Sequence, residues 1–404
     1  MSKYHSWQSL CKIVVIALFL ALGMTSDTYA SGGTVISVGL ETNKTSYVVS
    51  GDVPFVVTDA GGKRIICKMR ANDKVTVGMS KKGMTINGKT ITGTKVLIHP
   101  EGKNHKGVLK LNGVPYRGSF AISSISGKMS LKTVNQVLLE EYLYGVVPNE
   151  MSPSWASEAL KAQAVAARTF ALHDMKKHAA DGYDVCATTH CQVYRGVNSE
   201  HRATSSAVDL TAGEYLAYHG KAIISLFHAS GGGYTENSEN VWGKHEPYLR
   251  GVADFDHHNP NYQWEVKLTV GKLSSLLGNH MQRVGRLRAI KLSHLAKSPM
   301  HTSDRGISGR VRSLIVEGDK GTVTLSGTEV RSLLGLKSTL FDIDKRSFGS
   351  SANDTVTIRG YGFGHGLGMS QWGAKAMAEK GGNKNGLYKK ILLHYYRDTN
   401  LEKI

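Results

Sequence analysis

The sequence predicts an α+β fold in which β-rich lobes surround one long helix. In residues 31–135, short β-branched runs alternate with Gly-containing turns, and no helical period lasts more than two turns. From residue 150 the pattern changes, because residues 155–177 are rich in strong helix formers. Glycine accounts for 45 of the 404 residues without the Gly-X-Y period of collagen, which indicates many tight turns.

The first thirty residues have the pattern of a secretory signal peptide. Lys3 and Lys12 form a basic start, residues 13–24 are uncharged and mostly apolar, and residues 28–30 offer a small-x-small cleavage site. The apolar run is short for a membrane span. No later apolar stretch approaches the roughly eighteen residues that a span needs. We therefore expect a secreted or cell-envelope protein with no other membrane segment. An uncleaved N-terminal anchor is the alternative.

The chain is strongly basic, with a formal net charge of +18. Such a charge predicts a polyanionic partner. Export argues against nucleic acid, so the charge indicates an anionic component of the cell envelope. Cys11 lies in the signal segment, which leaves Cys67, Cys186 and Cys191 in a compartment that permits disulfides.

In the N-terminal region we expect strands over residues 35–38, 47–49, 53–57 and 85–87. Residues 108–118 read as a hairpin around Asn112-Gly113, a dipeptide that favours a two-residue turn.

The long helix carries an apolar stripe and follows a cluster of helix-start residues at 151–154. Glu150 lies just before it, among apolar neighbours that would raise its pKa toward general-acid work. A helix-capping role is the alternative. Lys161 and Arg168 are two turns apart on one face, which suits either a sugar carboxylate or a solvated basic surface.

The Cys186-x4-Cys191 pair has three interpretations. It could close a small disulfide loop, supply two zinc ligands with His178 or His190 nearby, or remain as free thiols. The spacing alone does not separate the disulfide from the metal site.

The segment 227–236 combines a histidine, hydroxyls and a carboxylate with three glycines. It could bring backbone N–H groups close to a ligand, or form a plain glycine turn. A serine nucleophile is disfavoured because the G-x-S-x-G elbow is absent. The chain also lacks a dinucleotide fingerprint, a P-loop and the H-E-x-x-H zinc motif.

Toward the C-terminus we expect a short helix near residues 273–277 and strands at 290–292, 311–316 and 322–325. A glycine-rich strand-turn at 355–369 precedes helices over about 370–380 and 387–396.

Several of these segments carry motifs of one family, in order along nearly the whole mature chain. They are residues 139–151, 159–169, 191–194, 228–232, 247–249, 308–311, 334–338 and 364–374. Together they resemble the stage II sporulation protein D (SpoIID/LytB-type) family of peptidoglycan lytic transglycosylases.

The resemblance implies a two-lobed molecule with a glycan-binding cleft. Its expected parts are a signal peptide (1–30), a β-rich N-terminal region (31–135), a catalytic core with the long helix and the Cys loop (136–265), a supporting β/α subdomain (266–345), and a Gly-His-Gly strand-turn with C-terminal helices that close the core (346–404).

The resemblance also implies site residues. Glu150 matches the catalytic acid/base. Cys186, Cys191 and His178 match ligands of a structural zinc. The expected substrate-binding residues are Lys161, Arg168, His228, Ser230, Gly232, Tyr248, His365 and Gln371.

The activity that the resemblance implies is cleavage of the MurNAc–GlcNAc β-1,4 bond without water, leaving a 1,6-anhydro-MurNAc end. One carboxyl suffices because the MurNAc 6-hydroxyl replaces water, whereas ordinary glycosidases use two. The expected substrate is glycan stripped of its stem peptides by an amidase, during sporulation or wall remodelling. The alternatives are a non-catalytic wall-binding protein that enhances an amidase and a zinc hydrolase.

Overall fold

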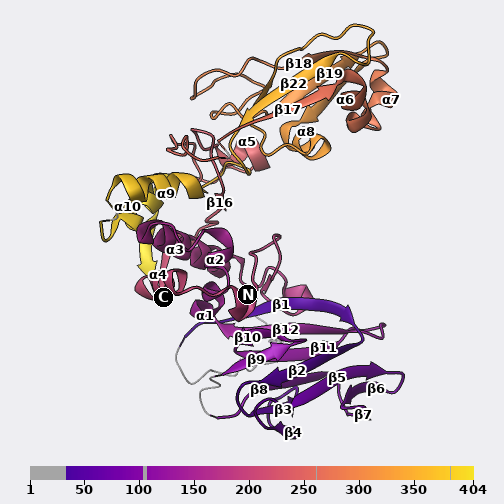
Figure 1. Ribbon diagram of the computed structural model, residues 1–404, viewed down its shortest axis with the longest axis vertical. Helices are drawn as coiled ribbons and strands as arrows, with labels where there is room; N and C mark the ends of the chain where they lie inside the picture. Colours follow the sequence, from indigo (N-terminus) through magenta and orange to yellow (C-terminus); the bar gives the residue numbers. More distant parts are fainter. Residues whose placement is uncertain (1–32, 103–106, 261, 383) are drawn as a thin grey trace, which may run out of the picture.

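The computed structural model describes residues 33–102, 107–260, 262–382 and 384–404, and it has a strand-rich α+β fold (Figure 1). The predicted signal peptide lies outside the described residues. Among the residues described, no helix combines the length and apolar character that crossing a membrane requires.

Two antiparallel-rich sheets form the N-terminal β unit, at the bottom of Figure 1. They enclose an apolar core that includes Tyr47, Val77, Ile98 and Phe120. The seven-stranded sheet has the order β13-β1-β12-β11-β8-β3-β4, and the six-stranded sheet has the order β10-β9-β2-β5-β6-β7. Their bounds are β1 Val35–Lys44, β2 Ser46–Gly51, β3 Phe55–Asp59, β4 Ile65–Met69, β5 Lys74–Ser80, β6 Gly83–Ile86, β7 Lys89–Thr90, β8 Lys95–Pro100, β9 Val108–Leu111, β10 Val114–Arg117, β11 Ser119–Ser124, β12 Leu131–Leu138 and β13 Val185–Cys186.

The hairpin predicted around Asn112-Gly113 is confirmed. β9 and β10 pair antiparallel, with Val114 opposite Leu111. Asn112 and Gly113 have φ of 49° and 87°, the positive values that a two-residue type I′ turn requires.

A helical layer follows the β unit. It contains α1 (Leu139–Tyr144), α2 (Val147–Glu150), α3 (Ser157–Asp174), α4 (Arg202–Leu210) and the short 3₁₀ turns η1 (Ala179–Asp181) and η2 (Gly196–Ser199). α3 packs against α1, α4, α9, α10 and β14. It begins two residues after the predicted start at residue 155, because Ala156 is its N-cap, with ψ of 135°, and residues 152–155 form a turn before the helix.

The C-terminal segment returns to this layer. β14 (Glu214–Tyr218) pairs with β15 (Lys221–Ala222) and with β24 (Asn400–Lys403), and β16 (Phe227–His228) pairs in parallel with β23 (Met369–Ser370). α9 (Gln371–Lys380) and α10 (Leu387–Tyr395) lie on α3. Ser370 caps α9 by accepting a hydrogen bond from the N–H of Gly373.

A separate unit with its own apolar core is inserted between β16 and β23, and it forms the top of Figure 1. Its entry and exit strands are adjacent, because β17 pairs antiparallel with β22 from Gln263 opposite Tyr361 onward. The elements between β16 and β23 are α5 Ser238–Trp242, β17 Gln263–Thr269, α6 Val270–Leu277, α7 His280–Val284, β18 Leu287–Lys291, β19 Ser313–Gly318, β20 Thr322–Ser326, α8 Gly327–Leu334, β21 Phe341–Ile343 and β22 Thr355–Tyr361.

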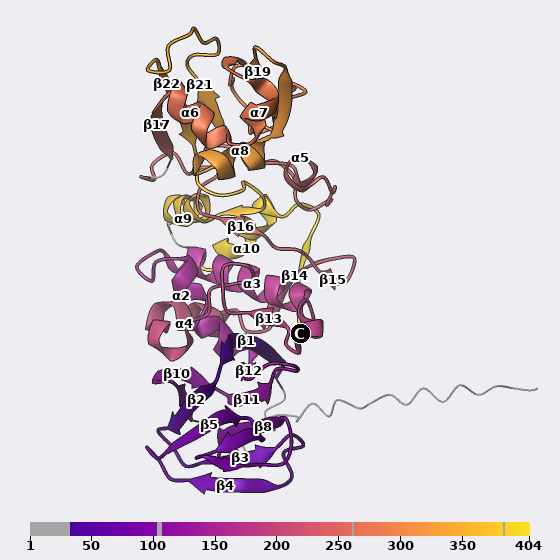
Figure 2. The same cartoon turned by 90° about the vertical axis from the view of Figure 1, so that its right-hand side faces the viewer.

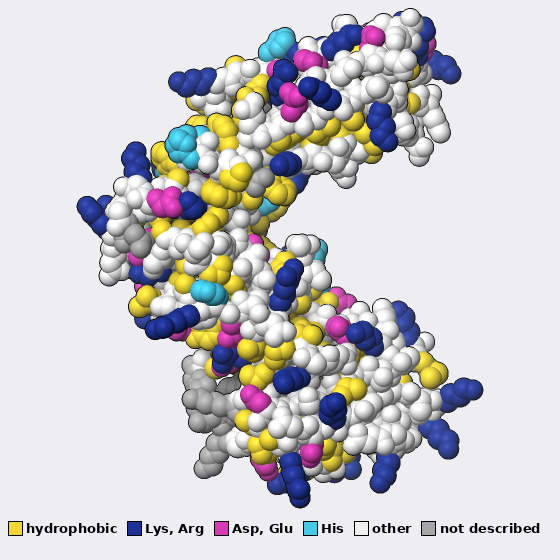
Figure 3. Space-filling model, viewed as in Figure 1, with side chains coloured by type: hydrophobic (Ala, Val, Ile, Leu, Met, Phe, Trp, Pro, Cys, Tyr) yellow, Lys and Arg dark blue, Asp and Glu magenta, His cyan; other side chains and the backbone are white. Residues whose placement is uncertain are grey.

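The space-filling view shows one side of the molecule hollowed at mid-height (Figure 3). In the same orientation, β16 and α2 lie at the back of this hollow, with α5 above it and the β unit below (Figure 1). The insertion and the β unit therefore project on either side of the helical layer.

Candidate functional site

Glu150 is the last residue of α2, at the turn that leads toward α3. Pro148 occupies the first turn of this short helix, and Met151 breaks it with ψ of 142°. The Glu150 carboxylate accepts a hydrogen bond of 3.5 Å from Nε2 of Gln371 on α9. Burial raises the pKa of Glu150, and the hydrogen bond from Gln371 opposes that effect. The net shift favours the protonated acid that a general-acid role needs.

Asn149 fixes the turn that carries Glu150. Its Nδ2 donates to the Gly145 carbonyl at 2.7 Å and to Oγ of Ser199 at 3.2 Å. α2 is thereby tied to the preceding helix and to the loop that follows the Cys pair. We identify Asn149 as a positioning residue that the sequence patterns alone did not single out.

Gln371 links three helices at this point. Besides Glu150 on α2, its Nε2 lies 3.4 Å from Oε1 of Gln163 on α3. Gln163 is fully buried, and its own Nε2 has no hydrogen-bond partner among the described residues. A buried amide nitrogen without a partner is costly. Nε2 of Gln163, which Gln371 links to Glu150, is therefore a candidate for a functional contact.

Lys161 and Arg168 lie in the interior rather than on a basic surface. Lys161 is 7% exposed, and its Nζ contacts Glu158 at 2.7 Å and Asn385 at 3.1 Å. Arg168 is fully buried and forms a bidentate pair with Glu140 at 2.8 and 2.6 Å. With their donors committed to protein groups, we assign both residues a structural role in place of the expected substrate contact.

The glycine turn at 231–233 is also held by groups of the same chain. Asp256 accepts hydrogen bonds from the N–H groups of Gly232 and Gly233 at 2.8 and 2.9 Å, and from the hydroxyl of the fully buried Ser230. The N–H of Gly231 donates to Asp254 at 3.1 Å. These backbone donors therefore face internal carboxylates, which corrects the expectation that they approach a ligand.

His228 and His365 lie together, with ring centroids 5.3 Å apart. Burial and nearby positive charge lower the pKa of both rings, to about 4 for His365. Nδ1 of His228 lies 3.0 Å from the Leu367 carbonyl, whereas its Nε2 is buried without a partner among the described residues. Both rings are therefore neutral at physiological pH. The exposed Trp242 ring lies 6.1 Å from His365.

Tyr248 packs into the apolar cluster of the helical layer and is 7% exposed. Its hydroxyl accepts a hydrogen bond of 3.4 Å from the N–H of Ile224, and burial raises its pKa to about 12. This environment makes Tyr248 a core residue that supports the layer beneath β16.

The structure gathers four metal-type donors around the Cys pair. The ligand atoms of His178, Cys186, His190 and Cys191 all lie within 4.8 Å of one another, and both thiols are free of disulfides. Pairing of β13 with β1 places Cys186 opposite Gly39 at the edge of the sheet. Burial acts to raise the pKa of the Cys186 thiol, but hydrogen bonds with Thr188 and His190 lower it overall, which favours the thiolate that metals bind.

The spacing of these donors fits a tetrahedral zinc ion. Zn–S and Zn–N bonds of about 2.3 and 2.05 Å in tetrahedral geometry place sulfur and nitrogen about 3.6 Å apart. Cys191 Sγ lies 3.4 Å from Nε2 of His178 and 3.7 Å from Nδ1 of His190, and Cys186 Sγ also lies 3.7 Å from Nδ1 of His190. His190 thus lies with the three expected ligands as a fourth candidate donor.

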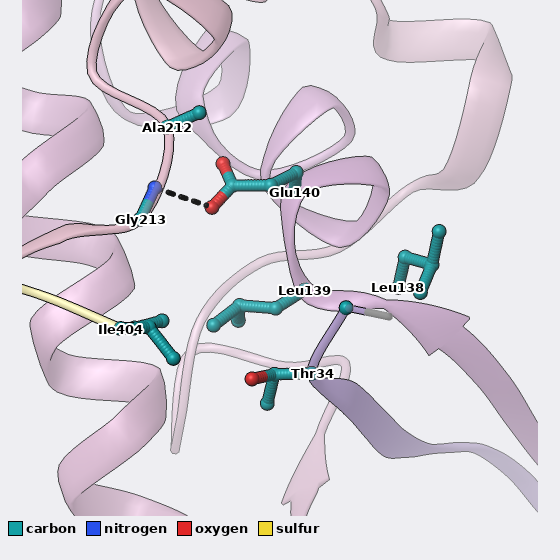
Figure 4. A pocket seen from close by; sticks show the side chains of 8 residues that line it. Thr34, Leu138, Leu139, Glu140, Ala212, Gly213 and Ile404 are labelled. Atoms are coloured by element: carbon teal, nitrogen blue, oxygen red, sulfur yellow. Dashed lines mark hydrogen bonds between the residues drawn. The ribbon is translucent and has the colours of Figure 1, made fainter. Parts of the chain in front are cut away.

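Two pockets of the described residues contain none of the predicted site residues. One, of about 310 Å³, lies where Thr34, Leu139, Gly213 and Ile404 meet (Figure 4). Its one acidic side chain, Glu140, accepts from the N–H of Gly213 at 3.1 Å and is paired with Arg168. We therefore attach no chemistry to this pocket.

Of the predicted residues, the structure brings Glu150 to Gln371, His228 to His365, and the Cys pair to His178. Asn149 and Gln163 were missed. Both lie inside segments recognised by their motifs, but no pattern of spacing identifies a residue that acts by holding another.

Two family models match the chain. A model described as stage II sporulation protein covers residues 127–218, which include Glu150, α3 and the Cys loop. A model described as a domain of unknown function (DUF8618) covers residues 244–368, which include the elements of the inserted unit from β17 to β22.

Three curated proteins illustrate the similarity. The chain is 33% identical to an uncharacterized protein of Brachyspira hyodysenteriae, over 91% of this chain and 92% of that protein. It is 34% identical to the stage II sporulation protein D of Bacillus amyloliquefaciens, over 68% of this chain and 77% of that protein. It is 32% identical to the amidase enhancer of Bacillus subtilis, over 76% of this chain but only 47% of that longer protein.

Proposed function

Because the chain belongs to the stage II sporulation protein D family, we propose that it is a secreted lytic transglycosylase that cleaves the MurNAc–GlcNAc β-1,4 bond of peptidoglycan. The observation that carries the proposal is Glu150, a carboxyl with a raised pKa at the end of α2, the helix that lies at the back of the hollow (Figure 1). Family membership supports the cell-wall context, and the chemistry of Glu150 supports the proposed reaction.

The proposed reaction uses one carboxyl twice. Protonated Glu150 donates its proton to the glycosidic oxygen as the bond to the MurNAc anomeric carbon breaks, which releases the sugar on the other side. The resulting carboxylate then takes the proton of the MurNAc 6-hydroxyl, whose oxygen bonds to the anomeric carbon. The products are a 1,6-anhydro end and regenerated Glu150.

The surroundings of Glu150 suit this double role. Among the described residues, its polar contact is with the neutral Gln371, and no second carboxylate or cation pairs with it. A charged partner would bind one protonation state too firmly, whereas a neutral amide can serve both the acid and the carboxylate. Holding the 6-hydroxyl near the anomeric carbon supplies the remaining advantage by making the attack intramolecular.

A zinc ion held by His178, Cys186, His190 and Cys191 would have a structural role in this proposal. Four protein ligands would leave no open coordination position, and such closed sites stabilise folds rather than activate water. The loop that the site would close also carries Gln192 and Val193, which contact Tyr142 at 3.2 Å and Asn149 at 3.5 Å. The metal site would therefore help to hold Asn149, and with it α2, in place.

A second candidate function is non-catalytic enhancement of a cell-wall amidase. The similarity to the Bacillus subtilis amidase enhancer favours it, and that name would make an amidase the partner. In that case the same hollow would bind glycan without cleaving it. Either role places the protein in the cell envelope, in sporulation or in wall remodelling.

Product analysis separates these functions. Purified protein is incubated with peptide-free glycan strands, and the products are identified by mass spectrometry. Anhydro ends that disappear in Glu150→Ala support the transglycosylase. Glycan binding without such products, together with faster turnover by an added amidase, supports the enhancer. Hydrolysed reducing ends that a chelator abolishes would support a zinc hydrolase instead.

A further inference from the structure

Two tryptophans from distant parts of the chain meet, and each is near a residue of the Glu150 site in the sequence. Trp155 lies in the turn between α2 and α3, and Trp372 lies in the first turn of α9. Their ring centroids are 4.9 Å apart, with an angle of 58° between the planes. Both side chains are partly exposed, so the pair presents aromatic surface to solvent.

A cation lies over both rings. Nζ of Lys375, also on α9, is 5.4 Å from the ring centroid of Trp372 and 6.0 Å from that of Trp155. Lys375 forms an exposed i,i+4 ion pair with Glu379 at 2.6 Å. An exposed pair of this kind is weak, so another carboxylate can replace Glu379 at low cost.

This group of three residues adjoins the proposed catalytic carboxyl. Trp372 directly follows Gln371, which contacts Glu150, and Trp155 is five residues beyond Glu150 in the chain. Figure 2 shows α2 and α9 on the same side of the molecule, one above the other. A sugar chain bound at Glu150 would therefore reach the aromatic pair with its neighbouring residues.

We propose that Trp155, Trp372 and Lys375 form a subsite for a sugar ring that carries a carboxylate. The inference rests on the proposed function and names the substrate group, a carboxylate on the sugar, that the subsite would bind. Aromatic faces pack against the C–H face of a pyranose ring, and the ammonium group pairs with an anionic substituent. In peptidoglycan glycan, that substituent is the MurNAc lactyl carboxylate, which is free only where no stem peptide is attached.

Lys375 is then the residue that distinguishes the two forms of the glycan. A free lactyl carboxylate can replace Glu379 on Lys375. A lactyl group bound in an amide to a stem peptide carries no charge and leaves Lys375 with Glu379. The aromatic pair binds either form, and the lysine adds preference for the peptide-free one.

The test measures binding in a Glu150→Gln background, which removes turnover. Peptide-free glycan oligomers, peptide-bearing oligomers and uncharged GlcNAc oligomers are titrated by calorimetry. Trp372→Ala should weaken binding of all three by about ten-fold, as for an aromatic anchor, and Trp372→Tyr should restore most of it. Lys375→Gln should weaken only the peptide-free glycan, by about two- to five-fold.

Two further variants sharpen the sign of the effect. Glu379→Gln frees Lys375 and should tighten binding of peptide-free glycan alone. Lys380→Gln removes the same charge from an exposed position at the end of α9. It should leave the affinities unchanged, apart from a small loss for charged glycans that disappears at high salt. Equal losses from Lys375→Gln and Lys380→Gln, or an unchanged affinity in Trp372→Ala with native thermal stability, would overturn the subsite.

The outcome is independent of the proposed reaction. If the unaltered protein yields no anhydro ends but the binding pattern above holds, the transglycosylase fails and the subsite stands. If anhydro ends form and the variants bind all three glycans like the parent, the subsite fails and the transglycosylase stands.

Discussion

Replacing Glu150 by Gln is the sharpest test of the proposed chemistry. Gln has the same shape and can still contact Gln371, but it can neither release a proton nor take one up. Loss of one general acid or base typically costs about 10²- to 10⁴-fold in rate. Since one group serves both halves of the reaction, we expect a loss at or beyond the upper end of that range.

A shorter carboxylate provides a matched control for position. Glu150→Asp keeps the acid but withdraws it by about one methylene, and a displacement of about 1 Å is enough to lose about 10²-fold. Its pKa should also be raised by the same burial. The order of activity expected is therefore parent, then Asp, then Gln.

Stability should change in the opposite direction. The pKa of Glu150 is raised in the folded protein, so its contribution is fully present below the unfolded-state pKa and is lost as the pH rises through the folded-state pKa. Glu150→Gln cannot ionise and escapes that loss. The melting temperature of Glu150→Gln minus that of the parent should therefore be larger at pH 8 than at pH 4.

The assay is mass spectrometry of anhydro ends released from peptide-free glycan, with melting curves recorded on the same samples. The reasoning fails if Glu150→Gln keeps more than about a tenth of the parent activity. It also fails if the melting temperature of Glu150→Gln, relative to that of the parent, is no higher at pH 8 than at pH 4.

Three further predictions follow from other parts of the structure. Metal analysis should find about one zinc per chain, with Cys186→Ser and Cys191→Ser each losing metal and melting temperature; intact stability after complete chelation would contradict this. Arg168→Met should lower the unfolding free energy by about 3–5 kcal/mol in urea titration, because it leaves Glu140 without its partner, and a shift below about 1 kcal/mol would argue against the structural role. Asp256→Ala should cost about 1–3 kcal/mol for each N–H left unpaired in the glycine turn, whereas an unchanged urea midpoint would show that water replaces the carboxylate.

The sequence by itself determined the features that depend on local pattern. The Asn112-Gly113 hairpin follows from backbone sterics, because few residues adopt positive φ at both turn positions. Strand and helix periodicity gave the α+β class, and ordered motifs gave the family, together with Glu150 as its candidate acid.

Tertiary structure alone decided what each polar residue faces. Lys161 and Arg168 have the spacing of a binding face, yet their partners Asn385 and Glu140 come from other segments and bury them. The glycines at 231–233 have the pattern of a ligand-binding turn, yet their N–H groups donate to Asp254 and Asp256 of the same chain. A buried polar side chain pairs with whichever group the fold brings within hydrogen-bond distance, and the sequence does not show which group that is. The meeting of Trp155 with Trp372, more than two hundred residues away in the chain, is therefore visible only once the chain has folded.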